Sequence, residues 1–487
     1  MTVAPGAGLP STLIPDLVLL DAVELSWSIR RREVSCVEVM RAYLDHIDRF
    51  NPQVNAIVSR AEEGDLLAQA RERDAQLDRG EPVGWMHGFP IAVKDLSDAA
   101  GFPTTKGSPL LAEHRAEADE RHVRRMRDAG AIVVGKTNVP EFGLGSHTFN
   151  PVFGTTTNPY DPSRSAGGSS GGAAAALAMR MLPVADGSDF MGSLRNPAGW
   201  NNVVSLRPGF GRVPAEGFLS EPSVPGPMGR TVRDIAMLLS TMAGPDPRAP
   251  LSIEQDPERF TGDLKHDFTG ARIGWIGDFG GYLPFDPGVL ELCSTASEAL
   301  REIGCTVEPV RTRLPTEQMW ETFLLWRRWR TGPNLAAAHA DPATRALLKP
   351  EAVYEVEGYL ELTVDDITRA LDGRDRWYAA VSALFDDYDY LLAPSAQVFP
   401  FDAGLRWPNR VGGREMDTYH RWMETVAPWT LSGHPVATVP VGFGADDLPM
   451  GVQLIGPNHA EWPLLKLACA YEAVTDWVHR VLPPALR

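Results

Sequence analysis

A lysine and two serines in separate parts of the chain have the side chains best suited to nucleophilic chemistry. Lys94 follows an apolar run with β-branched residues, and Ser169 lies in the glycine-rich loop Gly167–Gly172. Ser193 comes directly after Gly192, 24 residues beyond Ser169. A serine hydroxyl is a weak nucleophile until a neighbouring base accepts its proton. A lysine can be that base only where burial brings its pKa from ~10.4 toward about 7, at a cost of roughly 4–5 kcal/mol.

Other assignments for the same residues have a physical basis too. The run Gly168-Ser-Ser-Gly-Gly172 matches the pattern of a nucleophile elbow centred on Ser170, although its Asp/Glu and His partners could be any of many downstream residues. A Walker A loop is excluded, because no Lys-Ser/Thr pair follows at the required spacing. Taken singly, Lys94 could be a charged residue at a strand end, and each serine could be a turn hydroxyl.

Several separated motifs resemble, in order, those of the amidase signature family of serine hydrolases. They are His87-Gly-Phe-Pro-Ile-Ala-Val-Lys-Asp95, Gly135-Lys-Thr-Asn-Val-Pro-Glu-Phe142, Asn158-Pro, Gly167 to Gly172, Gly226-Pro-Met-Gly-Arg230, Ser432-Gly-His-Pro435 and Gly451-Val-Gln-Leu-Ile-Gly456. The resemblance covers nearly the whole chain. It implies a hydrolase with a Ser–cis-Ser–Lys triad that uses no cofactor and no metal.

The resemblance assigns a role to each residue of the triad. Ser193 is then the nucleophile, Ser169 is the bridging serine after a cis peptide bond from Gly168, and Lys94 is the base. In this scheme Ser169 passes the proton between Lys94 and Ser193, and later to the leaving nitrogen.

The loop before the nucleophile is expected to stabilise the oxyanion. By the resemblance, the donors are the backbone N–H groups of Phe190, Met191, Gly192 and Ser193. The family carries Gly-Thr-Asp-x-Gly-Gly-Ser-Ile-Arg here, whereas this chain has Gly187-Ser-Asp-Phe-Met-Gly-Ser-Leu-Arg195. Main-chain donors do not require glycine, so the hole can persist, but a methionine beside the nucleophile must change the shape of the pocket.

Two further groups of residues are expected to support the site. Asp189 and Arg195 match the family's residues and are interpreted, with Gly168, as supports of the loops. The turn Phe142, Gly143, Leu144 and Gly145, together with Met191, is expected to form part of the substrate pocket. Tryptophans between residues 320 and 422 could form another wall, or could be ordinary core residues.

The surrounding elements predict an α/β fold. Helical spacing from Val37 to Ile47 and from Asp119 to Asp128 alternates with the strand-like runs Gly88–Asp95 and Ala131–Gly135. We therefore expect the amidase signature fold, in which a central mixed β-sheet is flanked by helices on both sides. Residues 1–487 are expected to form a single domain, with 245–425 as a helical cover that sets substrate specificity.

Composition excludes several classes of protein. The formal charge is −17 over 487 residues, and no Lys/Arg-rich block is present, so we expect no nucleic-acid partner. No apolar run reaches the ~18 residues of a membrane span, and Met1–Leu20 lacks the features of a signal peptide. Four scattered cysteines and eleven scattered histidines indicate reduced thiols and no metal site. These features predict a cytoplasmic protein, as a monomer or homodimer.

Three functions follow as hypotheses. The first is a hydrolase that cleaves C–N bonds of amides or carbamates (urethanes), aryl or hydrophobic, through a Ser193 acyl-enzyme. The Phe-Met-Gly-Ser-Leu-Arg-Asn-Pro variant resembles the branch of the family with such substrates, and esters are included among the small molecules expected to bind. The second is an amidotransferase A-type subunit that acts in a complex. The third is a non-catalytic binding protein on the same scaffold.

Overall fold

The computed structural model describes residues 15–217, 223–310 and 314–487, and its largest sheet has eight strands. In spatial order these are β10 (Thr306–Pro309), β9 (Arg272–Trp275), β11 (Tyr390–Pro394), β15 (Pro449–Ile455), β14 (Val436–Phe443), β7 (Val204–Arg207), β8 (Val224–Gly229) and β6 (Ala185–Asp189). The sheet is mixed. β10, β9 and β11 are parallel, and every pairing from β11 through β15, β14, β7 and β8 to β6 is antiparallel.

Most strands of this sheet have no polar face. β15 is buried along its full length, and β14 is buried at every position but Phe443. Strands with helices on both faces contain near-continuous apolar runs instead of alternating ones, which explains their Val- and Leu-rich sequences. The strand β6 differs, because its sequence Ala-Asp-Gly-Ser-Asp carries the polar residues that precede Ser193.

A second, smaller sheet carries Lys94. Its order is β1 (Ile57–Val58), β3 (Ile132–Thr137) and β2 (Pro90–Lys94), with β2 and β3 parallel. The strand β2 contacts β6 of the large sheet. The end of β2 therefore lies beside the strand that leads to the nucleophile loop.

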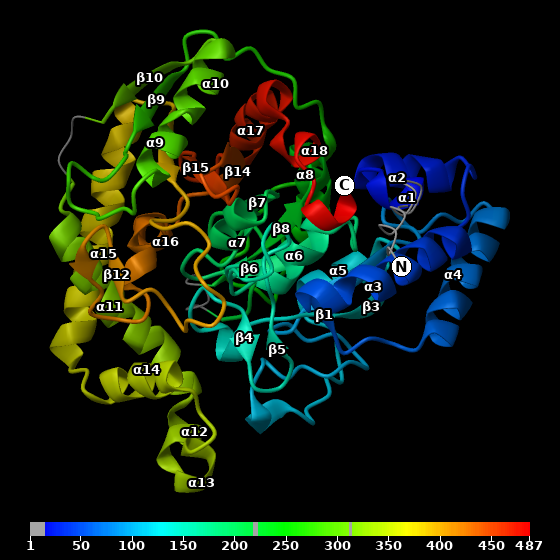
Figure 1. Cartoon of the computed structure of the whole chain (residues 1–487), viewed down its shortest axis with the longest axis horizontal. Helices are drawn as coiled ribbons and strands as arrows, with labels where there is room; N and C mark the ends of the chain where they lie inside the picture. Colours follow the sequence, from blue (N-terminus) through cyan, green and yellow to red (C-terminus); the bar gives the residue numbers. More distant parts are fainter. Residues whose placement is uncertain (1–14, 218–222, 311–313) are drawn as a thin grey trace, which may run out of the picture.

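Helices flank the large sheet in two layers (Figure 1). In one layer α8 (Val232–Met242) contacts α17 (Glu461–Thr475), which contacts α10 (Ala296–Glu302), and α10 contacts α9 (Val289–Ser294). In the other, α6 (Gly171–Ala178) contacts α7 (Arg195–Trp200), and α7 packs on β7, β14 and β15. This is the α/β architecture expected from the sequence.

Residues 245–425, expected to form a helical cover, are only partly helical. They also supply β9, β10 and β11 to the main sheet, where these three strands pair in parallel. The helical cover proper, drawn in green-yellow and olive in Figure 1, is a group of helices on one side of the molecule. It comprises α11 (Thr316–Thr331), α12 (Ala336–Ala340), α13 (Pro342–Arg345), α14 (Pro350–Leu360) and α15 (Val364–Ser382).

The remaining elements are spread over both halves of the chain. Their helices are α1 (Asp16–Leu19), α2 (Ala22–Arg30), α3 (Cys36–Val54), α4 (Glu63–Asp78), α5 (Arg121–Asp128), α16 (Ala427–Ser432) and α18 (Trp477–Arg480). Two short ribbons pair β4 (Phe149–Asn150) with β5 (Gly154–Thr155) and β12 (Arg410–Val411) with β13 (Arg414–Glu415). The 3₁₀ turns are η1 (Pro109–Leu111), η2 (Glu141–Gly143), η3 (Pro257–Thr261), η4 (Gly332–Asn334), η5 (Ala383–Asp386), η6 (Arg421–Val426) and η7 (Pro484–Leu486). Among the helices of the described ranges, none is both long and apolar enough to span a bilayer.

Candidate active site

Lys94 lies at the end of β2, fully buried, and its ammonium group is surrounded by serines. Its Nζ donates to Ser169 Oγ at 2.9 Å and to Ser170 Oγ at 2.8 Å. The same nitrogen also contacts Ser188, whose carbonyl oxygen lies at 3.0 Å and whose hydroxyl lies at 3.1 Å. The backbone N–H of Lys94 donates to Asp186 Oδ1, which ties the strand end to β6. Every group in reach of Nζ is thus a neutral oxygen.

This environment changes the acidity of the lysine. Burial lowers the pKa of Lys94 to about 7, against the opposing charges of Asp186 and Asp189. Desolvation disfavours the charged form of an amine, and no carboxylate is within hydrogen-bond distance of Nζ to restore it. A substantial fraction of Lys94 is therefore neutral near pH 7, as a general base must be.

Ser169 is held by the loop that leads into α6. The peptide bond between Gly168 and Ser169 is cis. The carbonyl of Gly168 accepts a hydrogen bond from Ser146 Oγ at 2.6 Å, and that of Gly167 accepts one from Thr148 Oγ1 at 2.8 Å. A Cβ on Gly168 would lie 2.9 Å from Thr148 Oγ1, so the loop packs too closely for a side chain there.

Ser170, the centre of the alternative elbow pattern, has a different place. Its hydroxyl accepts from Lys94, and its backbone N–H donates to the carbonyl of Ser193 at 3.2 Å. It does not line the cavity described below, whereas Ser169 and Ser193 both do. Ser170 therefore joins the two loops and positions the lysine.

Asp189 organises the loop that carries Ser193. Its Oδ1 accepts from the N–H of Gly192 at 2.9 Å, and its Oδ2 accepts from the N–H of Leu194 at 3.0 Å. The residues on both sides of Ser193 are thus fixed by one carboxylate. Gly192 has φ of +81°, and a Cβ there would lie 2.0 Å from Asn196 Oδ1, so only glycine fits.

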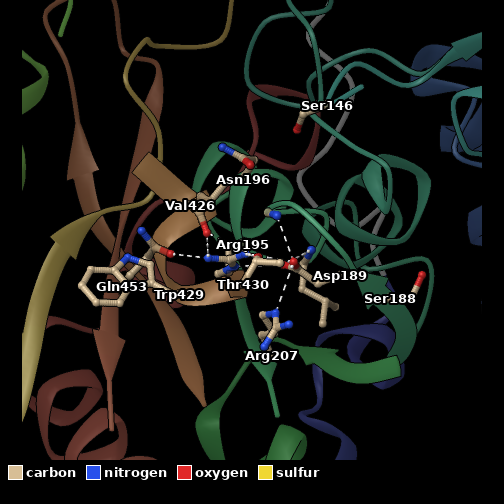
Figure 2. Close-up of polar contacts among 12 residues, drawn as sticks. Ser146, Ser188, Asp189, Arg195, Asn196, Arg207, Val426, Trp429, Thr430 and Gln453 are labelled. Carbon is tan, nitrogen blue, oxygen red and sulfur yellow. Dashed lines mark hydrogen bonds and ion pairs between the residues drawn. The ribbon is translucent and has the colours of Figure 1, made fainter. Parts of the chain in front are cut away.

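Arg195 holds this carboxylate in place (Figure 2). Its Nη2 and Nε donate to the two oxygens of Asp189 at 2.9 and 3.0 Å, and its Nη1 donates to the Val426 carbonyl and Gln453 Oε1, each at 2.8 Å. Arg207 lies on the other side, with Nε 3.5 Å from Asp189 Oδ1. Burial opposes the charge of Asp189, but Arg195 and Arg207 outweigh it and hold the pKa of this carboxyl well below its usual range.

Fewer backbone N–H groups than expected are available as donors in the oxyanion hole. The N–H of Gly192 is already donated to Asp189, so it is not available to an oxyanion in this geometry. By contrast, within the described ranges, the N–H groups of Phe190, Met191 and Ser193 have no acceptor. The sequence could not reveal this, because it depends on which N–H the Asp189 side chain reaches.

A cavity of about 320 Å³ opens at Ser169 and Ser193. Five residues expected in the substrate pocket line it: Phe142, Gly143, Leu144, Gly145 and Met191. So do Leu96, Ser188, Phe190, Ser223, Arg327, Arg330, Thr331, Asn334 and Met423, which sequence reasoning did not place there as pocket residues. Of the residues described at the cavity, none is tryptophan. Trp326 and Trp422 are instead fully buried in the core, so the simpler expectation for the tryptophans holds for these two.

The fold thus brings the three predicted triad residues close together. Lys94 contacts Ser169, and Ser169 and Ser193 line one cavity. Between Ser169 and Ser193, both of which the structure describes, no hydroxyl–hydroxyl hydrogen bond is present. Across the described residues, no group of three His, Cys, Asp or Glu side chains could hold a metal ion.

Comparison with known proteins shows the family of the chain. The profile of the amidase family matches residues 38–465. The chain belongs to the amidase family. It is 34% identical over 477 residues to an acylamidase of Rhodococcus erythropolis, with 95% of this chain and 96% of the relative covered. It is equally 34% identical, over 487 residues, to the A-type subunit of the glutamyl-tRNA(Gln) amidotransferase of Acidothermus cellulolyticus, covering 94% and 95%.

Solved structures give the same result for the fold. The crystal structure of a bacterial aryl acylamidase of the amidase signature family superposes with a TM-score of 0.87 at 30% identity. The match covers 94% of this chain and 97% of that one. The protein is therefore an amidase signature enzyme that acts on C–N bonds, and its central mixed sheet is the family's sheet.

Proposed function

We propose that this amidase hydrolyses aryl or hydrophobic amides, and the related carbamates, through an acyl-enzyme on Ser193. The observation that carries the proposal is the buried Lys94, whose Nζ lies 2.9 Å from Ser169 Oγ at a cavity that Ser193 also lines. The apolar side chains of Leu96, Leu144 and Phe190 at this cavity suit an aryl or alkyl group.

The reaction follows from the proton affinities of the three groups. Neutral Lys94 accepts the proton of the Ser169 hydroxyl, which in turn takes the proton of Ser193 as its Oγ attacks the substrate carbonyl carbon. The developing oxyanion accepts from the unoccupied N–H groups of this loop, those of Phe190, Met191 and Ser193. The proton returns through Ser169 to the leaving nitrogen as the C–N bond breaks.

Water then completes the cycle. It adds to the acyl-enzyme carbonyl, and its proton moves through Ser169 to Lys94. The Ser193–acyl bond breaks, and Ser193 regains a proton by the same route. Each step uses one base near neutrality, and this matches the lowered pKa of Lys94, at about 7.

The decisive experiment compares wild type with Ser193→Ala on p-nitroanilides, primary amides and aryl carbamates. We expect Ser193→Ala to lose turnover of every substrate class, and a fluorophosphonate to label only wild type, at Ser193, as read by mass spectrometry. Retained turnover in Ser193→Ala contradicts the mechanism. Failure to label wild type would favour the non-catalytic binding protein.

The amidotransferase role is the second candidate, because the amidotransferase relatives match as fully as the acylamidase does. An A-type subunit would depend on the other members of its complex for its reaction. We propose instead a free cytoplasmic enzyme, monomeric or homodimeric. Activity of the chain purified alone supports this proposal, and activity only with added partner proteins overturns it.

A further inference from the structure

The cavity has two chemically different sides. The side around Ser193 is mostly apolar, with Leu96, Phe142, Leu144, Phe190 and Met191. The side formed by α11 and the turn η4 presents only polar residues: Arg327, Arg330, Thr331 and Asn334. Positions three, four and seven apart share one face of a helix, so this side is a single polar stripe. None of the described residues that line the cavity is Asp or Glu.

Arg327 is the most firmly held member of the stripe. Its Nε donates to Glu355 Oε1 at 2.6 Å, and its Nη2 donates to the Tyr419 hydroxyl at 2.7 Å. The Tyr419 hydroxyl donates in turn to Glu355 Oε1 at 2.6 Å. The guanidinium also lies over the Phe190 ring, 4.9 Å from its centroid. These contacts together fix the plane of a side chain that is only 4% exposed.

The third nitrogen of the Arg327 guanidinium does not take part in these contacts. Nη1 of Arg327 donates to none of the described residues, and the Arg327 side chain lines the cavity. A guanidinium whose plane is fixed by its other contacts presents such a cavity-facing N–H in a set direction, which suits a planar anionic acceptor such as a carboxylate. The natural source of an acceptor at a cavity wall is the bound molecule.

We propose that Arg327 binds a carboxylate of the substrate, on a group remote from the scissile bond. The proposal rests on the proposed hydrolase function and names its substrate class: amides with an aryl or alkyl part and one anionic end. The apolar side of the cavity takes the first part. The absence of Asp and Glu from the described lining, together with the donors of Thr331 and Asn334, suits the anionic end.

Binding to Ser193→Ala tests this without turnover. Two pairs of ligands place the carboxylate on either side of the amide: 4-acetamidobenzoate against acetanilide, and succinanilate against butyranilide. Isothermal titration calorimetry should show at least about tenfold tighter binding of the carboxylate in one pair, as expected for a hydrogen bond between charged groups. Equal affinities in both pairs overturn the proposal, whatever the fate of the catalytic mechanism.

Substitutions then assign the effect to Arg327. Arg327→Lys keeps a charge beside Glu355 and removes Nη1, so the fold is retained and the preference should fall by about tenfold. Arg328→Met is the matched control, because Arg328 lies next along α11, donates to Tyr354 and does not line the cavity. It removes one positive charge and should leave the preference unchanged.

Turnover separates this proposal from the one on which it rests. In enzymes with Ser193 intact, Arg327→Lys should lower kcat/KM about tenfold more for the carboxylate ligand of the preferred pair than for its neutral partner, and a fluorophosphonate should still label Ser193. An equal loss on both partners, or the same loss in Arg328→Met, overturns the assignment. Failure of Ser193 to react, with the binding preference intact, overturns the hydrolase function alone.

Discussion

The two sides of the cavity are held in different ways. On the catalytic side, Asp189 binds two backbone N–H groups of its own loop, and Arg195 fixes Asp189 from six residues along the chain. On the cover side, the side chains of Arg327 and Lys349 make the contacts with the rest of the protein. Arg327 donates to the Tyr419 hydroxyl, and Lys349 donates to the carbonyl of Leu144. The first arrangement fixes the main chain next to the nucleophile. The second arrangement fixes residues of the cavity wall and does not contact the main chain next to Ser193.

Lys349 illustrates the second kind of contact. It precedes α14, and its Nζ donates to the carbonyl of Leu144 at 2.7 Å, in the turn that lines the cavity. Burial lowers the pKa of Lys349 to about 8, with Glu351 and Glu141 opposing this. We therefore expect the catalytic side to determine the rate of the chemical step and the cover to determine which molecule reaches it.

The largest expected effect is on the base. Lys94→Met preserves the volume of the buried side chain but removes the proton acceptor, and it should lower kcat by at least about 10³-fold. Steady-state kinetics on a p-nitroanilide measure the loss, and circular dichroism checks the fold. Activity within tenfold of wild type would show that the catalytic side is not what sets the rate.

A matched pair of buried carboxylates tests the comparison directly. Asp189→Asn and Glu355→Gln each remove the charge that pairs with a buried arginine, so each should lower the free energy of unfolding by ~3–5 kcal/mol. Only Asp189→Asn should also lower kcat, by about 10²-fold, because it disturbs the backbone beside Ser193. Denaturant unfolding measures the free energy of unfolding of each variant, and steady-state kinetics measure its kcat. Equal effects of both variants on kcat would remove the distinction between the two sides.

The pH dependence is expected to be a smaller effect. Because the neutral form of Lys94 is the base and its pKa is about 7, kcat/KM should rise with pH through that value. Asp186→Asn removes a negative charge that favours the ammonium form, so the midpoint of this rise should move to lower pH. Profiles of kcat/KM between pH 5 and 9 give the midpoint of the rise in wild type and in Asp186→Asn. A shift to higher pH would contradict the assignment of Lys94 as the group that titrates.

The smallest effect is expected on the cover side. Lys349→Met removes the hydrogen bond to Leu144, so the turn Phe142–Gly145 should be less well positioned. We expect KM to rise by about three- to tenfold with kcat within about twofold, the size of one lost hydrogen bond from a charged donor. Lys265→Met, at an exposed position, is the control. A fall in kcat larger than the rise in KM would place this contact with the chemical step.

The sequence was informative where function depends on local pattern. The apolar run before Lys94 and the glycines around Ser169 indicated a buried base and a tight loop, and the structure places the two side chains in contact. The turn Phe142–Gly145 was expected at the pocket and lines the cavity.

Other features lie beyond local pattern. The strand β6 was interpreted as part of a loop, because Asp-Gly-Ser-Asp has no apolar alternation, and pairing with β8 makes it a strand. Whether the Gly192 N–H is free for an oxyanion depends on how close the Asp189 carboxylate lies to it. The polar stripe of α11 has a helical period that was visible in the sequence, but its position opposite Ser193 depends on packing between distant segments.

The parallel strands β10, β9 and β11 give the cover a simple chain topology. All the cover helices occur between the end of β10 and the start of β11, so they form one enlarged crossover connection within the sheet. The entropy of closing such a connection changes slowly with its length. A whole cover could therefore be exchanged for that of another amidase as one continuous cassette, with the register of every sheet strand and the loops of Ser169 and Ser193 left in place.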